Sequence, residues 1–253
     1  TPGRNNSILK YDYDLAIVAS DTIFSKQNVE SGKTVDFQIE ILNQGINTSR
    51  QYMLHLYKDA NRDGIASESE KVWELRNIPS LEPDSSRVLE GQIFSGEPGR
   101  SHFIVELRTE KDHNPHNNRI YSFINISYPK NSLVLNEFMA NPAENQVEFV
   151  ELYNKSQDSI NLAEWSLSNS WNSCQISDFT LQPGNYLILT GDSAFYDYYG
   201  MDKSNILISS EFPRLTNISD TICLTDLAGK AIDSLYYDES WEIERGRSLE
   251  KYL

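Results

Sequence analysis

The chain has 253 residues, enough for two domains of ordinary size. It carries 37 acidic and 22 basic residues, a formal net charge of −15, and because nucleic-acid affinity depends on lysine and arginine, no nucleic acid is expected as a partner. No run approaches the 18 apolar residues of a membrane helix, so we expect no transmembrane segment in this fragment.

The charge is uneven along the chain. Residues 131–253 hold 19 acidic and 7 basic residues, a net −12, whereas residues 1–130 hold 18 and 15, a net −3. Fourteen tyrosines and ten phenylalanines against three methionines favour strands over helices. The composition therefore predicts an all-β protein with two domains.

Short strands separated by polar turns follow one another in the first half. The clearest is residues 34–42, where apolar Val35, Phe37, Ile39 and Ile41 alternate with polar residues, as in a strand with one buried face. The predicted strands are Leu15–Ser20, Thr34–Leu42, Gln51–Lys58, Val72–Arg76, Arg87–Phe94, His102–Arg108 and Arg119–Ser127. Seven such strands predict an immunoglobulin-like β-sandwich.

The loop from Asp59 to Glu70 has the spacing of a calcium loop. Oxygen side chains occupy its first, third, fifth, ninth and twelfth positions, Gly64 is sixth where the chain must turn, and the seventh would offer a main-chain carbonyl. The predicted metal ligands are Asp59, Asn61, Asp63, Ile65 (through its carbonyl), Ser67 and Glu70, and the predicted cofactor is Ca²⁺. Ala66 replaces the usual branched apolar residue and the flanks alternate like strands, so an acidic, solvated turn remains the alternative.

Two short motifs mark residues 13–128: Asn43 and Gly45 follow the second long strand, and a turn before the last strand is formed by Asn114, Pro115, Asn117 and Asn118. With these motifs, residues 13–128 resemble CARDB, a bacterial cell-adhesion-related Ig-like domain. The resemblance implies a non-catalytic extracellular module.

A polar linker at residues 129–131 separates this domain from the second, at residues 132–253. Residues 136–142 (NEFMANP), 148–154 (EFVELYN), 162–168 (LAEWSLS), 181–186 and 247–251, with a short helix expected at residues 192–199, resemble the motifs of the lamin-tail domain. The resemblance implies a second Ig-like sandwich; nuclear lamins use this domain as an interaction surface, and bacteria carry it in secreted and surface proteins.

Residues 1–12 are predicted to be a leader. The opening TPGRNNS resembles the usual ending of a lamin-tail domain. We therefore expect a further lamin-tail domain before Thr1, in an alternating array.

Other candidate sites are weaker. Cys174 and Cys223 either form a disulfide or are two buried thiols in neighbouring strands. Three residues apart on one strand, Glu148 and Glu151 point to opposite faces and do not make a catalytic pair. Trp165 is expected in the core, which leaves Trp171 and Trp241 as carbohydrate candidates. No catalytic residue is predicted, and we expect no enzyme activity.

The predicted function is a calcium-stabilised structural or adhesion module of a secreted or cell-surface protein. Its expected partners are other domains or copies of that protein, a carbohydrate or a cell-surface protein. Two alternatives remain open: accessory binding domains of a larger secreted hydrolase, such as a nuclease or phosphoesterase, and a subunit of an extracellular filament or appendage.

Overall fold

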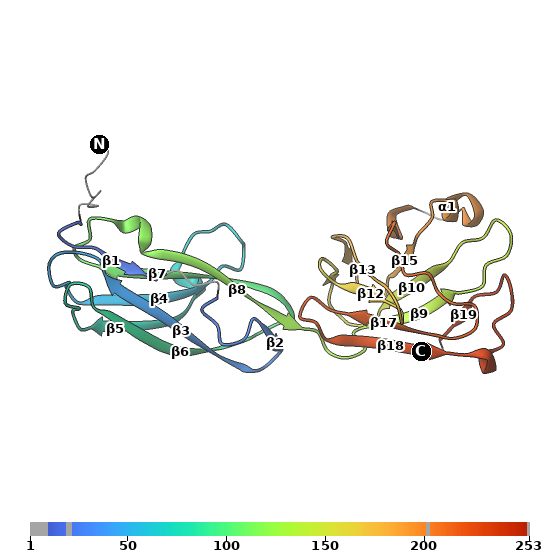
Figure 1. Cartoon of the computed structure of the whole chain (residues 1–253), viewed down its shortest axis with the longest axis horizontal. Helices are drawn as coiled ribbons and strands as arrows, with labels where there is room; N and C mark the ends of the chain where they lie inside the picture. The colour runs from blue at the N-terminus through green and yellow to red at the C-terminus, as the bar shows by residue number, and fades with distance from the viewer. Residues whose placement is uncertain (1–9, 19–21, 201–202, 252–253) are drawn as a thin grey trace, which may run out of the picture. The chain divides into compact units, whose positions relative to one another are not determined.

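The structure, a computed structural model, describes residues 10–18, 22–200 and 203–251. The chain divides into two compact units, Thr1–Asn125 and Ile126–Leu253 (Figure 1). Residues 1–9 of the predicted leader and residues 19–20 of the first predicted strand lie outside the described residues.

The first unit is built from two antiparallel sheets. One has the strand order β1-β3-β6 and the other β2-β8-β7-β4-β5. The elements are β1 (Leu15–Ile17), β2 (Asn28–Glu30), β3 (Thr34–Asn43), β4 (Tyr52–Lys58), the 3₁₀ helix η1 (Glu68–Glu70), β5 (Lys71–Ile78), β6 (Ser86–Phe94), β7 (Gly99–Thr109), η2 (Pro115–Asn117) and β8 (Arg119–Ser127).

The alternation of buried and exposed residues along β3 shows which face of its sheet forms the core of this unit. Val35, Phe37, Ile39 and Ile41 are each at most 3% exposed, while most of the residues between them face solvent. On the other sheet, Phe103, Val105 and Leu107 of β7 are buried on one face, and Ile104 between them is buried as well. The two dry faces form the core of a sandwich.

The second unit has three sheets, ordered β16-β15-β10-β9-β19, β13-β12-β17-β18 and β11-β14. The elements are β9 (Leu133–Met139), β10 (Phe149–Asn154), β11 (Ile160–Asn161), β12 (Ser166–Ser168), β13 (Ser173–Gln175), β14 (Thr180–Leu181), β15 (Tyr186–Thr190), α1 (Ala194–Tyr199), η3 (Lys203–Asn205), β16 (Ile206–Ile208), β17 (Asp220–Thr225), β18 (Ala231–Tyr237), η4 (Glu239–Trp241) and β19 (Leu249–Glu250).

Trp165 lies at 0% exposure in the main core of the second unit, as expected from the sequence. A separate small apolar cluster sits on the opposite face of β10. There Phe195 of α1 packs edge-on against Phe149, with Met139, Ile188 and Ile206 around them. The short predicted helix is therefore present and covers one end of this face.

One arrangement of hydrogen bonds occurs in both units. At the end of β3 the fully buried Asn43 donates from Nδ2 to the carbonyls of Asn47 and Leu81 at 2.9 and 2.8 Å, and its Oδ1 accepts from the Gly45 N–H at 3.0 Å. At the end of β10 the fully buried Asn154 makes the corresponding bonds. Its partners are the carbonyls of Asp158 and Leu181, both at 2.9 Å, and the N–H of Ser156 at 3.0 Å.

We call each of these buried asparagines with its two turns an asparagine clip. In each clip the main-chain carbonyl of the asparagine also accepts an N–H from a second turn, at Asp84 in the first unit and Gly184 in the second, both at 2.9 Å. Both of these turn residues have a positive φ, 58° and 72°. The clip thus joins the end of one strand to the start of its antiparallel partner, β6 or β15.

The fold class predicted from the sequence, all-β with two tandem Ig-like sandwiches, is confirmed. No helix among the described residues is long and apolar enough to span a membrane.

Candidate functional site

The predicted calcium loop connects β4 to β5 and ends in η1. Asp59, its first residue, is 7% exposed, and its N–H donates to the His102 carbonyl of β7 at 2.9 Å, so the loop starts from a fixed point. Gly64 has a φ of 72° with no atom near the position of a Cβ, as the sharp turn at the sixth position requires. The backbone therefore follows the turn that the sequence predicts.

The carboxylates of the loop accept hydrogen bonds from the loop itself. Asp59 accepts the N–H groups of Asp63 and Gly64, both at 3.1 Å, and Asp63 accepts the N–H of Ile65 at 2.7 Å. Glu70 closes the loop by accepting the N–H of Ala60 at 3.1 Å.

The two neutral donors predicted at the third and ninth positions also turn toward these carboxylates. Asn61 donates from Nδ2 to Asp63 at 2.9 Å, and the Ser67 hydroxyl donates to Glu70 at 2.7 Å. The side chain of Ile65, the residue predicted to bind through its carbonyl, is 62% exposed.

The donor set fits a hard cation, because all six predicted ligands are oxygens and each carboxylate keeps lone pairs beyond the hydrogen bonds it accepts. The carboxylates are not gathered around one point: among the described residues, no three His, Cys, Asp or Glu side chains form a group that could hold a metal. Binding would require Asp59, Asp63 and Glu70 to turn from the N–H groups they now accept toward the ion.

The end of the loop is fastened to the outer face of the sheet by Glu68, a residue that the sequence analysis did not single out. Glu68 pairs with Lys71 at 2.7 Å and with Arg108 of β7 at 3.8 Å. Nothing in the local sequence marks this role, because it depends on the register that brings β7 beside β4.

Next to Glu68 lies a buried histidine. His55 is 4% exposed; its Nδ1 lies 2.9 Å from the Tyr57 hydroxyl and its Nε2 lies 3.7 Å from Glu74. Burial, with smaller contributions from Arg108 and Lys71, lowers the pKa of His55 below its ordinary value of 6.5. The histidine is therefore neutral at pH 7, and its Nε2 has no hydrogen-bond partner.

Among the described residues, Trp171 is the most exposed large apolar side chain, at 79%, and hydrogen bonds hold its turn. Asn169 accepts the Trp171 N–H at 2.9 Å and donates to Asp220 at 3.1 Å, and the Ser170 N–H donates to Asp220 at 3.1 Å. Burial raises the pKa of Asp220, but the hydrogen bonds it accepts from Ser170 and from neighbouring amides outweigh burial and hold the pKa below its usual range. Trp241, the other candidate, is 41% exposed in η4.

The disulfide that the sequence left open is not formed: Cys174 and Cys223 are free thiols. Cys174 of β13 pairs with Leu167 of β12, and Cys223 of β17 pairs with Ser168 of β12, so β12 lies between the two cysteines. Two strand spacings are about 9.6 Å, beyond the Cα separation of about 4.4 to 6.8 Å that a disulfide requires. The expectation of neighbouring strands was therefore wrong as well.

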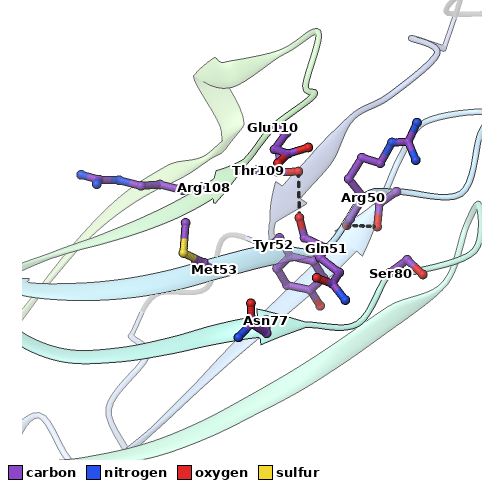
Figure 2. A pocket seen from close by; sticks show the side chains of 10 residues that line it. Arg50, Gln51, Tyr52, Met53, Asn77, Ser80, Arg108, Thr109 and Glu110 are labelled. Carbon is purple, nitrogen blue, oxygen red and sulfur yellow. Dashed lines mark hydrogen bonds between the residues drawn. The ribbon is translucent and has the colours of Figure 1, made fainter.

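Figure 2 shows a groove of 560 Å³ in the first unit, lined by Arg50, Tyr52, Asn77, Arg108 and Glu110 among others. Its inner wall is the ring of Tyr52, which is 1% exposed. Burial raises the pKa of Tyr52, and Arg87 opposes this. One dashed bond in the figure runs from Thr109 Oγ1 to the Gln51 carbonyl at 3.4 Å and links the end of β7 to the residue before β4.

A smaller groove of 290 Å³ in the second unit is lined by Glu148, Asp192, Phe212 and Arg214, with others. Burial raises the pKa of Glu148, and the Leu215 N–H donates to it at 3.2 Å. Glu151 instead accepts from Asn136 at 2.7 Å on the opposite face of β10. The two glutamates therefore point to opposite faces, as the sequence predicted.

The family model of the lamin tail domain matches residues 126–239. Among solved structures, the CARDB domain of the PF1109 protein from Pyrococcus furiosus, crystallised in complex with di-metal ions, is 16% identical; the match covers 47% of this chain and 94% of that chain, with a TM-score of 0.35. It covers the N-terminal part of this chain.

Two further similar structures are the secreted serine protease VesC from Vibrio cholerae and the transglutaminase of red sea bream. The first is 9% identical over 70% of this chain and 44% of that chain, and the second 9% over 91% and 31%; both have a TM-score of 0.31. Among curated proteins, none matches this chain.

Both families noted in the sequence thus reappear in the comparisons, each over its own part of the chain. Both modules have an Ig-like β-sandwich fold. The lamin tail domain is thus the family to which residues 126–239 of this chain are similar.

Proposed function

We propose that the chain is a non-catalytic, calcium-stabilised structural or adhesion segment of a secreted or cell-surface protein. The loop from Asp59 to Glu70 carries the proposal. Its first and last carboxylates accept hydrogen bonds from the same short stretch of backbone, and all the metal ligands predicted between them are oxygen atoms. Its partners would be other domains or copies of the same protein.

A calcium ion in this loop would make the first unit mechanically stiffer. Three carboxylates in one tight turn repel each other, and a divalent cation cancels that repulsion. The loop is anchored at Asp59 to β7 and at Glu68 to Lys71 and Arg108. Fixing its middle would therefore stiffen β4, β5 and β7 together.

The size of the effect follows from mass action. Extracellular calcium modules bind with dissociation constants on the order of 10⁻⁴ to 10⁻³ M. At ten times the dissociation constant, binding stabilises the folded state by RT ln 11, about 1.4 kcal/mol. Such affinity suits an extracellular calcium concentration.

The test is the thermal unfolding of the whole chain in 5 mM calcium and in a calcium chelator, with titration calorimetry using calcium alone. We expect a higher melting temperature of the first unit in calcium, and loss of that difference in Asp63→Ala. Ser80→Ala, an exposed serine of the same unit outside the loop, is the control and should respond like the wild type. Equal melting of the wild type in both buffers would refute the proposal.

The accessory role in a larger secreted hydrolase is the second candidate, because the turn of Trp171 is held rigidly by Asp220 with its indole in solvent. A preorganised exposed tryptophan is typical of binding surfaces. Retention of the chain on immobilised polysaccharides, lost in Trp171→Ala and kept in Ile218→Ala, would support this candidate.

A further inference from the structure

Strand β6 forms the end of its sheet in the part of the chain that the structure describes. It pairs with β3 over nine consecutive residues without a shift in register. The other long end strand of this unit, β5, has two shifts against β4 and a left-handed residue, Asn77. Bulges and kinks of that kind prevent strand addition, and β6 has neither.

The backbone of β6 alternates in a definite phase. The Ser95 N–H donates to Lys33 at 2.8 Å, and the Asn43 N–H donates to Ser85 at 3.0 Å, one at each end of the β3–β6 ladder. Since bonded pairs in an antiparallel ladder recur every second residue, the odd-numbered residues of β6 bond to β3. The N–H and carbonyl groups of the even-numbered residues therefore point to the open edge.

The side chains of these same even-numbered residues lie on the wet face of the sheet. Val88 is 52% exposed and Phe94 68% exposed, an unusual pair at the two ends of one edge. Between them Glu90 accepts from Gln38 of β3 at 2.9 Å, and Gln92 donates to Asp36 of β3 at 2.7 Å. The exposed side chains along the open edge are thus apolar at Val88, acidic at Glu90, an amide at Gln92 and apolar at Phe94.

We propose that two copies of this chain associate through β6, strand against antiparallel strand, with Gly91 on the twofold axis. In this register Val88 lies opposite Phe94 of the second copy, and Glu90 lies opposite Gln92, each pair occurring twice. Every even-numbered residue then exchanges N–H and carbonyl bonds with an even-numbered residue, as the phase of the ladder demands.

The side chains fit this register. Gln92 uses one of its two N–H groups on Asp36, which leaves the other for Glu90 of the second copy. The hydrogen bonds then run across four strands, from Gln38 to Glu90 to the second copy's Gln92 and Asp36. At both ends of the interface, an aromatic ring covers a β-branched residue, a favourable cross-strand pair.

Neighbouring registers are worse. A shift by two residues in one direction places Glu90 opposite Glu90, and like charges directly opposite are destabilising. The shift in the other direction places Phe94 opposite Glu90 and leaves Val88 without an apolar partner. The edge is self-complementary in one register only.

The interface is small, so we expect weak association, with a dissociation constant on the order of 10⁻⁵ to 10⁻⁴ M. The first test is sedimentation equilibrium of the full chain from micromolar to millimolar concentration. The wild type should show a monomer–dimer equilibrium, and Phe94→Lys should weaken it at least about tenfold by removing two cross-strand pairs. Val72→Lys, an exposed valine on β5, is the control and should dimerise like the wild type.

The second test checks the register. Bonded residues on adjacent strands have Cα atoms about 5.5 Å apart, within the range of a disulfide. In a background with Cys174→Ser and Cys223→Ser, which removes the native free thiols, an equimolar mixture of Val88→Cys and Phe94→Cys should form a cross-linked heterodimer under mild oxidation, whereas neither variant alone should. Native melting temperatures of both variants, whose altered side chains face solvent, confirm that they are folded.

Three results would overturn the proposal. A wild type that stays monomeric at millimolar concentration refutes self-association, and so does a dimer that survives Phe94→Lys. Equal cross-linking in the single variants and in the mixture refutes the register. Capture of an extended peptide by a monomeric wild type would assign this edge to a different partner.

Discussion

Gly91 in the middle of β6 tests whether the core of the first unit is packed as described. A Cβ at this position would lie 2.4 Å from Cζ of Phe37, 2.8 Å from its Cε1 and 2.9 Å from Cε2 of Trp73. The Phe37 ring is 1% exposed and packs edge-on against both Trp73 and Phe24, so it has little room to move. Gly91→Ala must therefore displace packed rings.

The magnitude follows from two opposing effects. Overpacking a dense core costs about 1 to 3 kcal/mol, whereas replacing glycine in a strand interior gains about 0.5 to 1 kcal/mol from lower chain entropy. We expect Gly91→Ala to lower the free energy of unfolding by about 1 to 2 kcal/mol, or the melting temperature of the first unit by about 4 to 10 °C. Urea unfolding measures the free energy of unfolding, and calorimetry measures the melting temperature.

The double variant Gly91→Ala, Phe37→Leu supplies the control. If the clash is the cause, the alanine should cost less in the leucine background than in the wild type, because a smaller side chain leaves room for the methyl group. A Gly91→Ala variant more stable than the wild type would show that only chain entropy matters there, and would refute the packing argument.

Three further predictions concern buried polar groups. Burial lowers the pKa of His55, so at pH values between this lowered pKa and about 6.5 the unfolded chain binds a proton that the folded chain does not. The first unit should therefore lose stability as pH falls through this range, and it should lose less in His55→Gln. Burial raises the pKa of Glu148 and Glu151, so the second unit should gain stability as pH falls toward 4.5, and the two calorimetric transitions should move in opposite directions. Asn43→Ala and Asn154→Ala should each destabilise their own unit by about 2 to 4 kcal/mol, because each leaves buried backbone groups without a partner. The control is Asn47→Ala, an exposed side chain in the same turn as Asn43, which should change stability by less than about 0.5 kcal/mol. Equal effects of Asn43→Ala and Asn47→Ala would contradict the role of the clip.

Strands with strong alternation were predictable from the sequence because one buried face leaves its mark on every second residue. Residues 34–42 were assigned within one residue of β3. Strand β2 was missed, since Asn28 and Glu30 are exposed and only Val29 between them is partly buried. Strand β5 is longer than predicted at both ends, and it continues past Asn77, whose positive φ would ordinarily end a strand.

The candidate site likewise has one part that the local sequence predicts and another that depends on long-range contacts. Ligand spacing within one loop is a local property, so the residues from Asp59 to Glu70 could be named in advance. The attachment of that loop by Glu68 to Arg108, and the separation of Cys174 from Cys223 by β12, depend on which strands become neighbours. Such long-range order leaves no trace in the spacing of residues along the chain.

The two asparagine clips also supply a natural spectroscopic reporter for each unit. The side-chain NH₂ groups of Asn43 and Asn154 are sealed from water and bonded to carbonyls, so their protons should exchange with D₂O only when the surrounding unit opens. Two pairs of amide resonances should therefore persist long after exposed asparagines have exchanged. Their separate decay would give the opening free energy of each sandwich within the intact chain, with no added label.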